Sequence, residues 1–98
     1  DAELLALFPD LDADLVLAGH THHVTDRVIG GTRFVNPCSI SNHVTDPRYA
    51  AYPVLHDRAT GHELDFRSVE HDIDRMIGAL RASALPGRQF VLDQYVGA

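Results

Sequence analysis

Three histidines stand within four positions at the end of a short apolar run, in the stretch LVLAGHTHHV at residues 15–24. Imidazole nitrogen is a good ligand for zinc, iron, nickel and cobalt, and the second nitrogen of each ring bonds a carboxylate or carbonyl that orients it. Alternate side chains of an extended chain project to the same side, so His20 and His22 are predicted to point together, with His23 on the opposite side at the surface. This spacing suits two ligands on one ion or one ligand on each of two neighbouring ions. The spacing alone does not distinguish a metal site from a chance cluster of histidines.

The residues around the histidines are expected to shape the loop that carries them. Gly19 is predicted to let the backbone leave the strand at an angle that residues with a Cβ resist. The hydroxyl of Thr21 is suited to holding a local turn. Asp26 is a candidate carboxylate partner for an imidazole.

The elements that must position these residues are predicted from apolar spacing and from turn residues. The expected order is a helix over 1–8, a strand over 15–18, a hairpin of 27–29 and 32–35 around Gly30-Gly31, a loop over 36–48, a second hairpin of 49–55 and 62–69, a helix capped by Asp72, and a short final helix over 90–96. Leu64 and Phe66 are predicted on a buried strand face, and the helix stripe Ile73, Met76, Ile77 and Leu80 in the core. This order predicts a mixed α/β fold with a mostly antiparallel sheet and helices on one face.

Composition narrows the class of protein. The chain has 98 residues and a net charge of −6, and its eight basic residues, all arginines, are scattered from Arg27 to Arg88. A nucleic-acid binder needs a concentrated basic face, so we expect no nucleic-acid partner. No apolar run approaches the roughly 20 residues that span a bilayer, so we expect no membrane partner. The lone cysteine and the absence of a basic, apolar leader predict a cytoplasmic location.

Several motifs in order resemble a known family. GHTH at 19–22 is followed by GTRFVNPCS at 31–39 and by DPRYAAYPVL at 46–55. This series resembles the C-terminal signature of the calcineurin-like metallophosphoesterase superfamily, in particular its compact bacterial phosphodiesterase and phosphatase members. The resemblance continues through TGHELDFRSVEHD at 60–72 and covers nearly the whole chain.

The resemblance implies both a fold and an activity. Residues 1–98 would form a single partial domain, the C-terminal half of a four-layer αββα sandwich. The complete enzyme would hydrolyse phosphate mono- or diesters by attack of a hydroxide held between two divalent ions, drawn from Mn, Fe, Zn, Ni or Co. His20 would ligate one ion and His22 the other. No catalytic residue beyond these metal ligands is carried over to this chain.

Four further residues are implied to support the two ligands. Gly19 belongs to the ligand motif itself, and Asn36 and Ser39 are expected to hold the neighbouring loop by bonding backbone groups. Cys38 stands where relatives usually carry glycine, which tolerates a positive φ that cysteine adopts only at a cost. We expect Cys38 to be a small buried residue, with the alternative that its thiolate ligates a metal.

The ligands that family members carry ahead of this motif, an Asp-x-His, a Gly-Asp-x-x-Asp and a Gly-Asn-His, do not occur before His20. Two imidazoles cannot complete the shells of two ions, so this chain alone is expected to be inactive. The expected partners are a phosphate-ester substrate, the missing N-terminal half and, through exposed apolar surface, a second copy of the chain. Two alternatives are a non-catalytic scaffold or protein-interaction module of the same fold, and a mononuclear metal binder that uses His20, His22 and Cys38.

Overall fold

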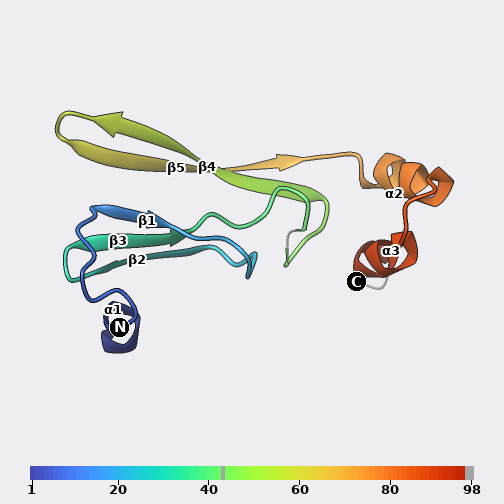
Figure 1. Ribbon diagram of the computed structural model, residues 1–98. Helices are drawn as coiled ribbons and strands as arrows, with labels where there is room; N and C mark the ends of the chain where they lie inside the picture. The colour runs from blue at the N-terminus through green and yellow to red at the C-terminus, as the bar shows by residue number, and fades with distance from the viewer. Residues whose placement is uncertain (43, 97–98) are drawn as a thin grey trace.

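The structure is a computed structural model that describes residues 1–42 and 44–96 (Figure 1). Its elements in chain order are α1 (Ala2–Ala6), β1 (Leu15–Leu17), β2 (Thr25–Ile29), β3 (Thr32–Asn36), β4 (Tyr49–Arg58), β5 (Gly61–Glu70), α2 (Ile73–Ala82) and α3 (Arg88–Val96). The strands form a three-stranded sheet in the order β1-β3-β2 and a separate two-stranded sheet of β4 and β5.

The first predicted hairpin is confirmed. β2 and β3 pair antiparallel, with Ile29 opposite Thr32 and the two glycines forming the turn between them. Gly30 and Gly31 have φ values of 58° and 87°. Positive φ at both central residues is the requirement of a type I′ turn, whose twist matches that of the flanking strands, and glycine meets it without a steric penalty.

β1 pairs with β3 in parallel, a pairing that the sequence analysis did not predict. Leu15 lies opposite Arg33 and Leu17 lies opposite Val35. Parallel neighbours direct their carboxyl ends to the same edge of a sheet. The segment after Leu17, which carries the histidines, therefore leaves the sheet beside the segment after Asn36. This pairing places the candidate site.

β4 and β5 form a hairpin that lies over the three-stranded sheet (Figure 1). The two strands pair without interruption from Tyr49–Glu70 to Arg58–Gly61, so they are longer than predicted. Pro53 sits within the ladder opposite Phe66. A proline is tolerated there because both strands of a two-stranded sheet are edge strands, where a missing N–H need not break a ladder bond.

The core is small and is centred on β3. Its buried apolar residues are Ile29, Phe34, Val35, Cys38 and Ala51. Leu92 is also buried, but it lies apart from this core on α3. The rings of Phe34 and Phe8, which follows α1, lie 6.1 Å apart between centroids. The Thr32 hydroxyl donates to the Ala13 carbonyl at 2.7 Å, which ties the start of β3 to the segment before β1. β3 is therefore the best-anchored strand of the sheet that carries the site.

Replacing Phe34 with alanine is expected to remove a large part of the stability of the chain. Truncating a buried phenylalanine costs about 3–5 kcal/mol, which is large against the roughly 5–15 kcal/mol that small domains have. Urea unfolding followed by circular dichroism measures the loss. Val28→Ala is a matched control, because Val28 is 70% exposed on the neighbouring strand β2 and should change the free energy of unfolding by about 0.5 kcal/mol or less. Equal midpoints for the two variants would contradict the central role of Phe34.

Two predictions of burial are wrong. Phe66 is 39% exposed, and it borders an open hollow together with Val24 and Pro37. The stripe of Ile73, Met76, Ile77 and Leu80 is only half-buried. α2 does begin as predicted, with the Asp72 side chain accepting from the Arg75 N–H at 2.9 Å, but α2 and α3 pack on each other beyond the end of the hairpin (Figure 1). The apolar spacing correctly predicts an amphipathic helix, but it does not predict that this helix packs on α3.

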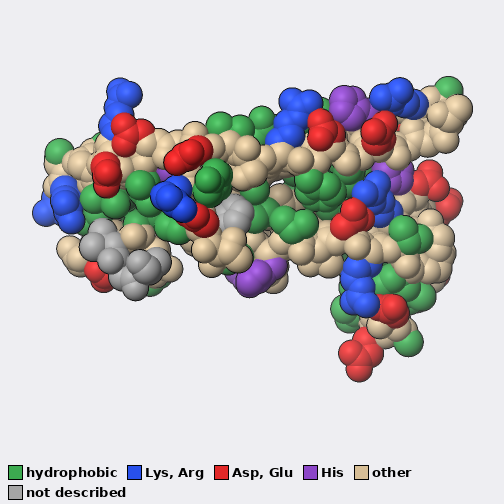
Figure 2. Space-filling view, turned by 180° about the vertical axis from the view of Figure 1, so that it is seen from behind, with side chains coloured by type: hydrophobic (Ala, Val, Ile, Leu, Met, Phe, Trp, Pro, Cys, Tyr) green, Lys and Arg blue, Asp and Glu red, His purple; other side chains and the backbone are tan. Residues whose placement is uncertain are grey.

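The fold class is confirmed as mixed α/β with mostly antiparallel strands and flanking helices. The chain is elongated, with a radius of gyration of 17.2 Å against about 13 Å for a compact domain of this length. Acidic and arginine side chains are mixed along the face shown in Figure 2. None of the helices described in residues 1–96 has the length and apolar character needed to cross a membrane. The single partial domain over 1–98 stays a prediction.

Candidate metal centre

The segment that carries the histidines is a bend, so the prediction of an extended chain with alternating side chains is wrong. The last ladder bond of β1 runs from the Ala18 N–H to the Val35 carbonyl at 2.9 Å. Pairing stops there because Pro37 follows the end of β3 and has no N–H to donate. Beyond this point His20 has a φ of 93° and His22 a φ of 60°. Both values lie in the left-handed region, which strains residues that have a Cβ.

The expected role of Gly19 is not seen. Its φ lies outside the left-handed region, and a Cβ at this position would meet no atom within 4 Å. The sharp change in direction falls instead on His20 and His22. Strained residues persist only where their surroundings hold them, and they gather at functional sites. The strain therefore draws attention to the two histidines rather than to the glycine.

Cys38 is buried, as predicted, and it keeps a φ of 78° despite its side chain. Its thiol donates to the His22 carbonyl at 3.1 Å. This bond joins the loop after β3 to the loop after β1. With His20 and His22, Cys38 is the third non-glycine residue of these two loops that has a positive φ.

Asn36 bonds to both loops. Its Nδ2 donates to the Thr21 Oγ1 at 2.9 Å, and its Oδ1 accepts from the Cys38 N–H at 3.1 Å. From the sequence, Thr21 is expected to hold only its own turn. No sequence pattern indicates the hydrogen bond between Thr21 and Asn36, which lie fifteen positions apart. Ser39 acts further along the chain, where its Oγ accepts from the Asn42 N–H at 3.0 Å and its carbonyl accepts from the Ala51 N–H at 3.1 Å.

The donors available for a metal are the imidazoles of His20, which is exposed, and His22, which is half-buried. His23 is exposed, as predicted. Among residues 1–42 and 44–96, no three histidine, cysteine, aspartate or glutamate side chains lie together as a metal site requires. The mononuclear alternative that adds Cys38 is therefore wrong for the described residues. The two imidazoles have the right chemistry for part of a ligand set, and further donors are needed to complete it.

Asp26 is engaged by an arginine rather than by an imidazole. The Arg33 guanidinium donates from Nε and Nη2 to its two carboxylate oxygens at 2.8 and 2.7 Å. This bidentate bond lowers the pKa of Asp26 below its ordinary value of 3.8, although desolvation opposes the shift. A carboxylate held in this way is not the imidazole partner that the sequence analysis considered.

The Asp26–Arg33 pair makes stability depend on acid pH. Because the folded pKa of Asp26 is lowered, its stabilisation is present above the unfolded value and is lost as pH falls through the folded value. The Asp26 side chain is 35% exposed, so the pair is worth about 1 kcal/mol or less. We expect Asp26→Asn to be slightly less stable than wild type at pH 7 and equal to it near pH 2–3 in urea unfolding. A difference that does not change with pH would contradict this role.

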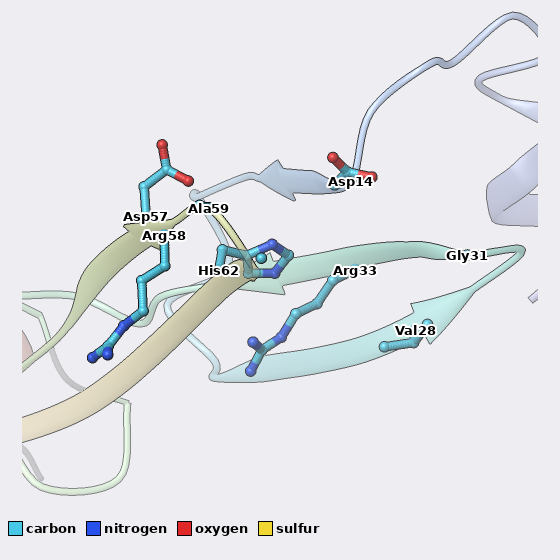
Figure 3. Close-up of a pocket in the computed structure, with 9 residues that line it drawn as sticks. Asp14, Val28, Gly31, Arg33, Asp57, Arg58, Ala59 and His62 are labelled. Atoms are coloured by element: carbon cyan, nitrogen blue, oxygen red, sulfur yellow. The ribbon is translucent and has the colours of Figure 1, made fainter.

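A hollow lies at the opposite end of the three-stranded sheet from the histidine loop. It encloses about 640 Å³ between the start of β3 and the β4–β5 turn, and it includes Asp14, Arg33, Arg58 and His62 (Figure 3). Its arginines already have carboxylate partners, Asp26 for Arg33 and Glu63 at 3.4 Å for Arg58. A smaller hollow of about 310 Å³ borders the histidine loop at Gly19 and Thr21 and is otherwise lined mainly by apolar side chains of α1, β1 and β3. The hollow that borders the histidine loop is therefore the smaller of the two, so hollow volume does not indicate the candidate metal site.

The fold and the loops define a class of protein. Two stacked sheets, with a His-x-His loop held at the carboxyl edge of a parallel strand pair, form a mixed α/β scaffold. The model of the calcineurin-like phosphoesterase superfamily domain matches residues 2–59. The chain belongs to this family, and the predicted resemblance is confirmed. The match runs from α1 into the β4–β5 turn and includes both loops of the candidate site.

One solved structure, a single-mutant form of Vps29 from Entamoeba histolytica, is similar to the chain at 20% sequence identity and a TM-score of 0.38. The similarity covers 71% of this chain and 48% of that one, so the chain spans about half the length of that structure. No curated protein matches the sequence.

Proposed function

We propose that this chain supplies the C-terminal part of a metal-dependent phosphoesterase that hydrolyses phosphate mono- or diesters, and that His20 and His22 are its metal ligands. Membership of the calcineurin-like phosphoesterase family supports the reaction class. The single observation that carries the ligand assignment is the backbone of the histidine loop. His20 and His22, which are separated by one residue, both have a positive φ. The loop after β3 lies beside them, and its residues bond to Thr21 and to the His22 carbonyl.

The two ligands have separate tasks in this proposal. His20 would hold one divalent ion and His22 a second, with Mn, Fe, Zn, Ni or Co as the ions that imidazole accepts. When bound, such ions neutralise the charge that develops on a transferring phosphoryl group and lower the pKa of water. The residues of this chain position the two rings. His22 is half-buried, whereas His20 is exposed and open to a further layer of protein.

The remaining ligands would come from an N-terminal half of the domain. Large apolar residues on the described surface support such a partner, among them Leu17 at 52% exposed, on the short edge strand β1. An edge strand with apolar side chains and unpaired backbone groups is suited to pairing with another chain segment. The cytoplasmic location expected from the sequence is part of the same proposal.

The exposed apolar surface also favours a second candidate function. Val28 at 70% and Phe90 at 71% exposed lie on β2 and α3, and exposed apolar patches mark protein–protein contacts. A protein-interaction module with this fold would use these surfaces, self-association included, and would not need metal at His20 and His22.

Metal titration separates the two functions. The complete domain, with its N-terminal half, is titrated with Zn²⁺ while the ring signals of each histidine are followed by NMR. Shifts at His20 and His22 that are absent at His23 support the phosphoesterase. Rings that do not respond to metal would overturn it and favour the interaction module.

A further inference from the structure

We propose that Asn36 is a positioning residue that sets the conformation of the loop between His20 and His22. The inference rests on the proposed function, because positioning matters here only if the histidines bind metal. Asn36 touches neither a ligand ring nor a substrate, and it acts through Thr21 and Cys38.

Three hydrogen bonds form a continuous path between the two loops. Asn36 Nδ2 donates to the Thr21 hydroxyl, the Cys38 N–H donates to Asn36 Oδ1, and the Cys38 thiol donates to the His22 carbonyl. The path therefore ends at Thr21 and at His22, which are the residue between the two predicted ligands and the second ligand itself. The side-chain amide of Asn36 takes part in two of these bonds, with Nδ2 as a donor and Oδ1 as an acceptor.

Asn36 is also the member that is attached to the rigid part of the fold. It is the last residue of β3 and pairs with Thr25 of β2. Its neighbours Phe34 and Val35 are buried in the core. The loops on either side have little regular structure of their own, so the amide of Asn36 transmits the position of the central strand to both of them.

The backbone strain explains why such a path is needed. His22 and Cys38 have φ values of 60° and 78°, and a left-handed backbone is strained at a residue that has a Cβ. Without bonds that favour this conformation, the loop would populate more relaxed backbones in which the rings are displaced. The apparent metal dissociation constant rises as the fraction of the competent conformation falls.

Asn36→Leu removes both amide contacts at nearly constant volume. We expect this variant to bind Zn²⁺ at least about fivefold more weakly than wild type, with the effect greatest in the NMR shifts of the His22 ring. Asn36→Asp should bind Zn²⁺ within about twofold of wild type, because one carboxylate oxygen still accepts from the Cys38 N–H and the other can accept from the Thr21 hydroxyl. The urea midpoint of each variant reports any general loss of stability.

Asn42→Leu is the matched control. Asn42 lies in the neighbouring loop, and its bond to Ser39 uses its backbone N–H, which the substitution keeps. We expect wild-type affinity for this variant. Weakening equal to that of Asn36→Leu would overturn the inference, because any change in these loops would then have the same effect.

The outcomes for Asn36 and for the proposed function are distinct. Zn²⁺ that leaves the His20 and His22 signals of the complete wild-type domain unchanged overturns the proposed function. Zn²⁺ that shifts these signals with equal affinity in wild type and Asn36→Leu overturns the positioning role alone. If Asn36→Leu does not fold, Thr21→Val decides, because it removes only the hydroxyl that Asn36 contacts. A twofold or greater weakening is expected for Thr21→Val, and unchanged affinity contradicts the inference.

Discussion

Replacing His22 with alanine is expected to lower the turnover of phosphate esters by the complete enzyme by more than about a hundredfold. Substitutions of residues that only support a metal ligand already cost about 10–100-fold in affinity or activity, and loss of the ligand itself should cost more. His22 is the half-buried residue of the pair, and its carbonyl accepts a hydrogen bond from the Cys38 thiol. The measurements are the rate with p-nitrophenyl phosphate esters and the metal content of the purified protein.

The adjacent histidine provides the control for this experiment. His23 has the same side chain one position along and is exposed, so His23→Ala should keep metal content and turnover near wild type. His20→Ala should resemble His22→Ala, because each is assigned one ion. Full turnover in His22→Ala would remove His22 from the ligand set, and a loss shared by His23→Ala would point to a general effect on the loop.

The 98-residue chain alone is expected to show no hydrolysis of p-nitrophenyl phosphate esters above the uncatalysed rate, even with added Mn²⁺. Enzymes accelerate reactions by about 10⁶-fold or more, and this depends on complete ligand shells. The described residues bring no three metal-binding side chains together. Two imidazoles leave each ion mostly hydrated and free to exchange, so the charge that stabilises the transition state is not fixed in place.

Complementation makes this second experiment informative. A separately produced N-terminal half of the domain, carrying the Asp-x-His and Gly-Asn-His motifs, should restore turnover when mixed with the chain. The same mixture with His22→Ala should not. Robust turnover by the chain alone would show that the residues of the chain suffice, and would contradict the proposal that another segment completes the site.

Local features were predictable because they depend on few neighbouring residues. The two-glycine turn between β2 and β3 follows from the need for positive φ at both central positions. The start of α2 at Asp72 follows from the acceptor that a helix N-terminus requires. Family membership was predictable as well, since ordered motifs in the loops and strands carry it.

The geometry of the candidate site was predicted less well. Alternation along a strand assumed that β1 continues through the histidines, but its ladder ends where β3 reaches Pro37. Pro37, seventeen positions away in the sequence, thus decides the backbone at His20. Burial of Phe66 and of the α2 stripe failed for a related reason, because an apolar pattern shows that a face needs a partner without showing where the partner is.

The sequence by itself predicted the candidate metal ligands, His20 and His22, and determined the turn and the helix cap that shape the elements around them. Only the tertiary structure decided how the loops are held: the parallel pairing of β1 with β3, the positive φ at three residues with side chains, and the path of hydrogen bonds through Asn36. The reason is the range of the interactions involved. Turns and caps are settled within a few positions of chain, whereas the site depends on contacts between segments that become neighbours only when two strands align.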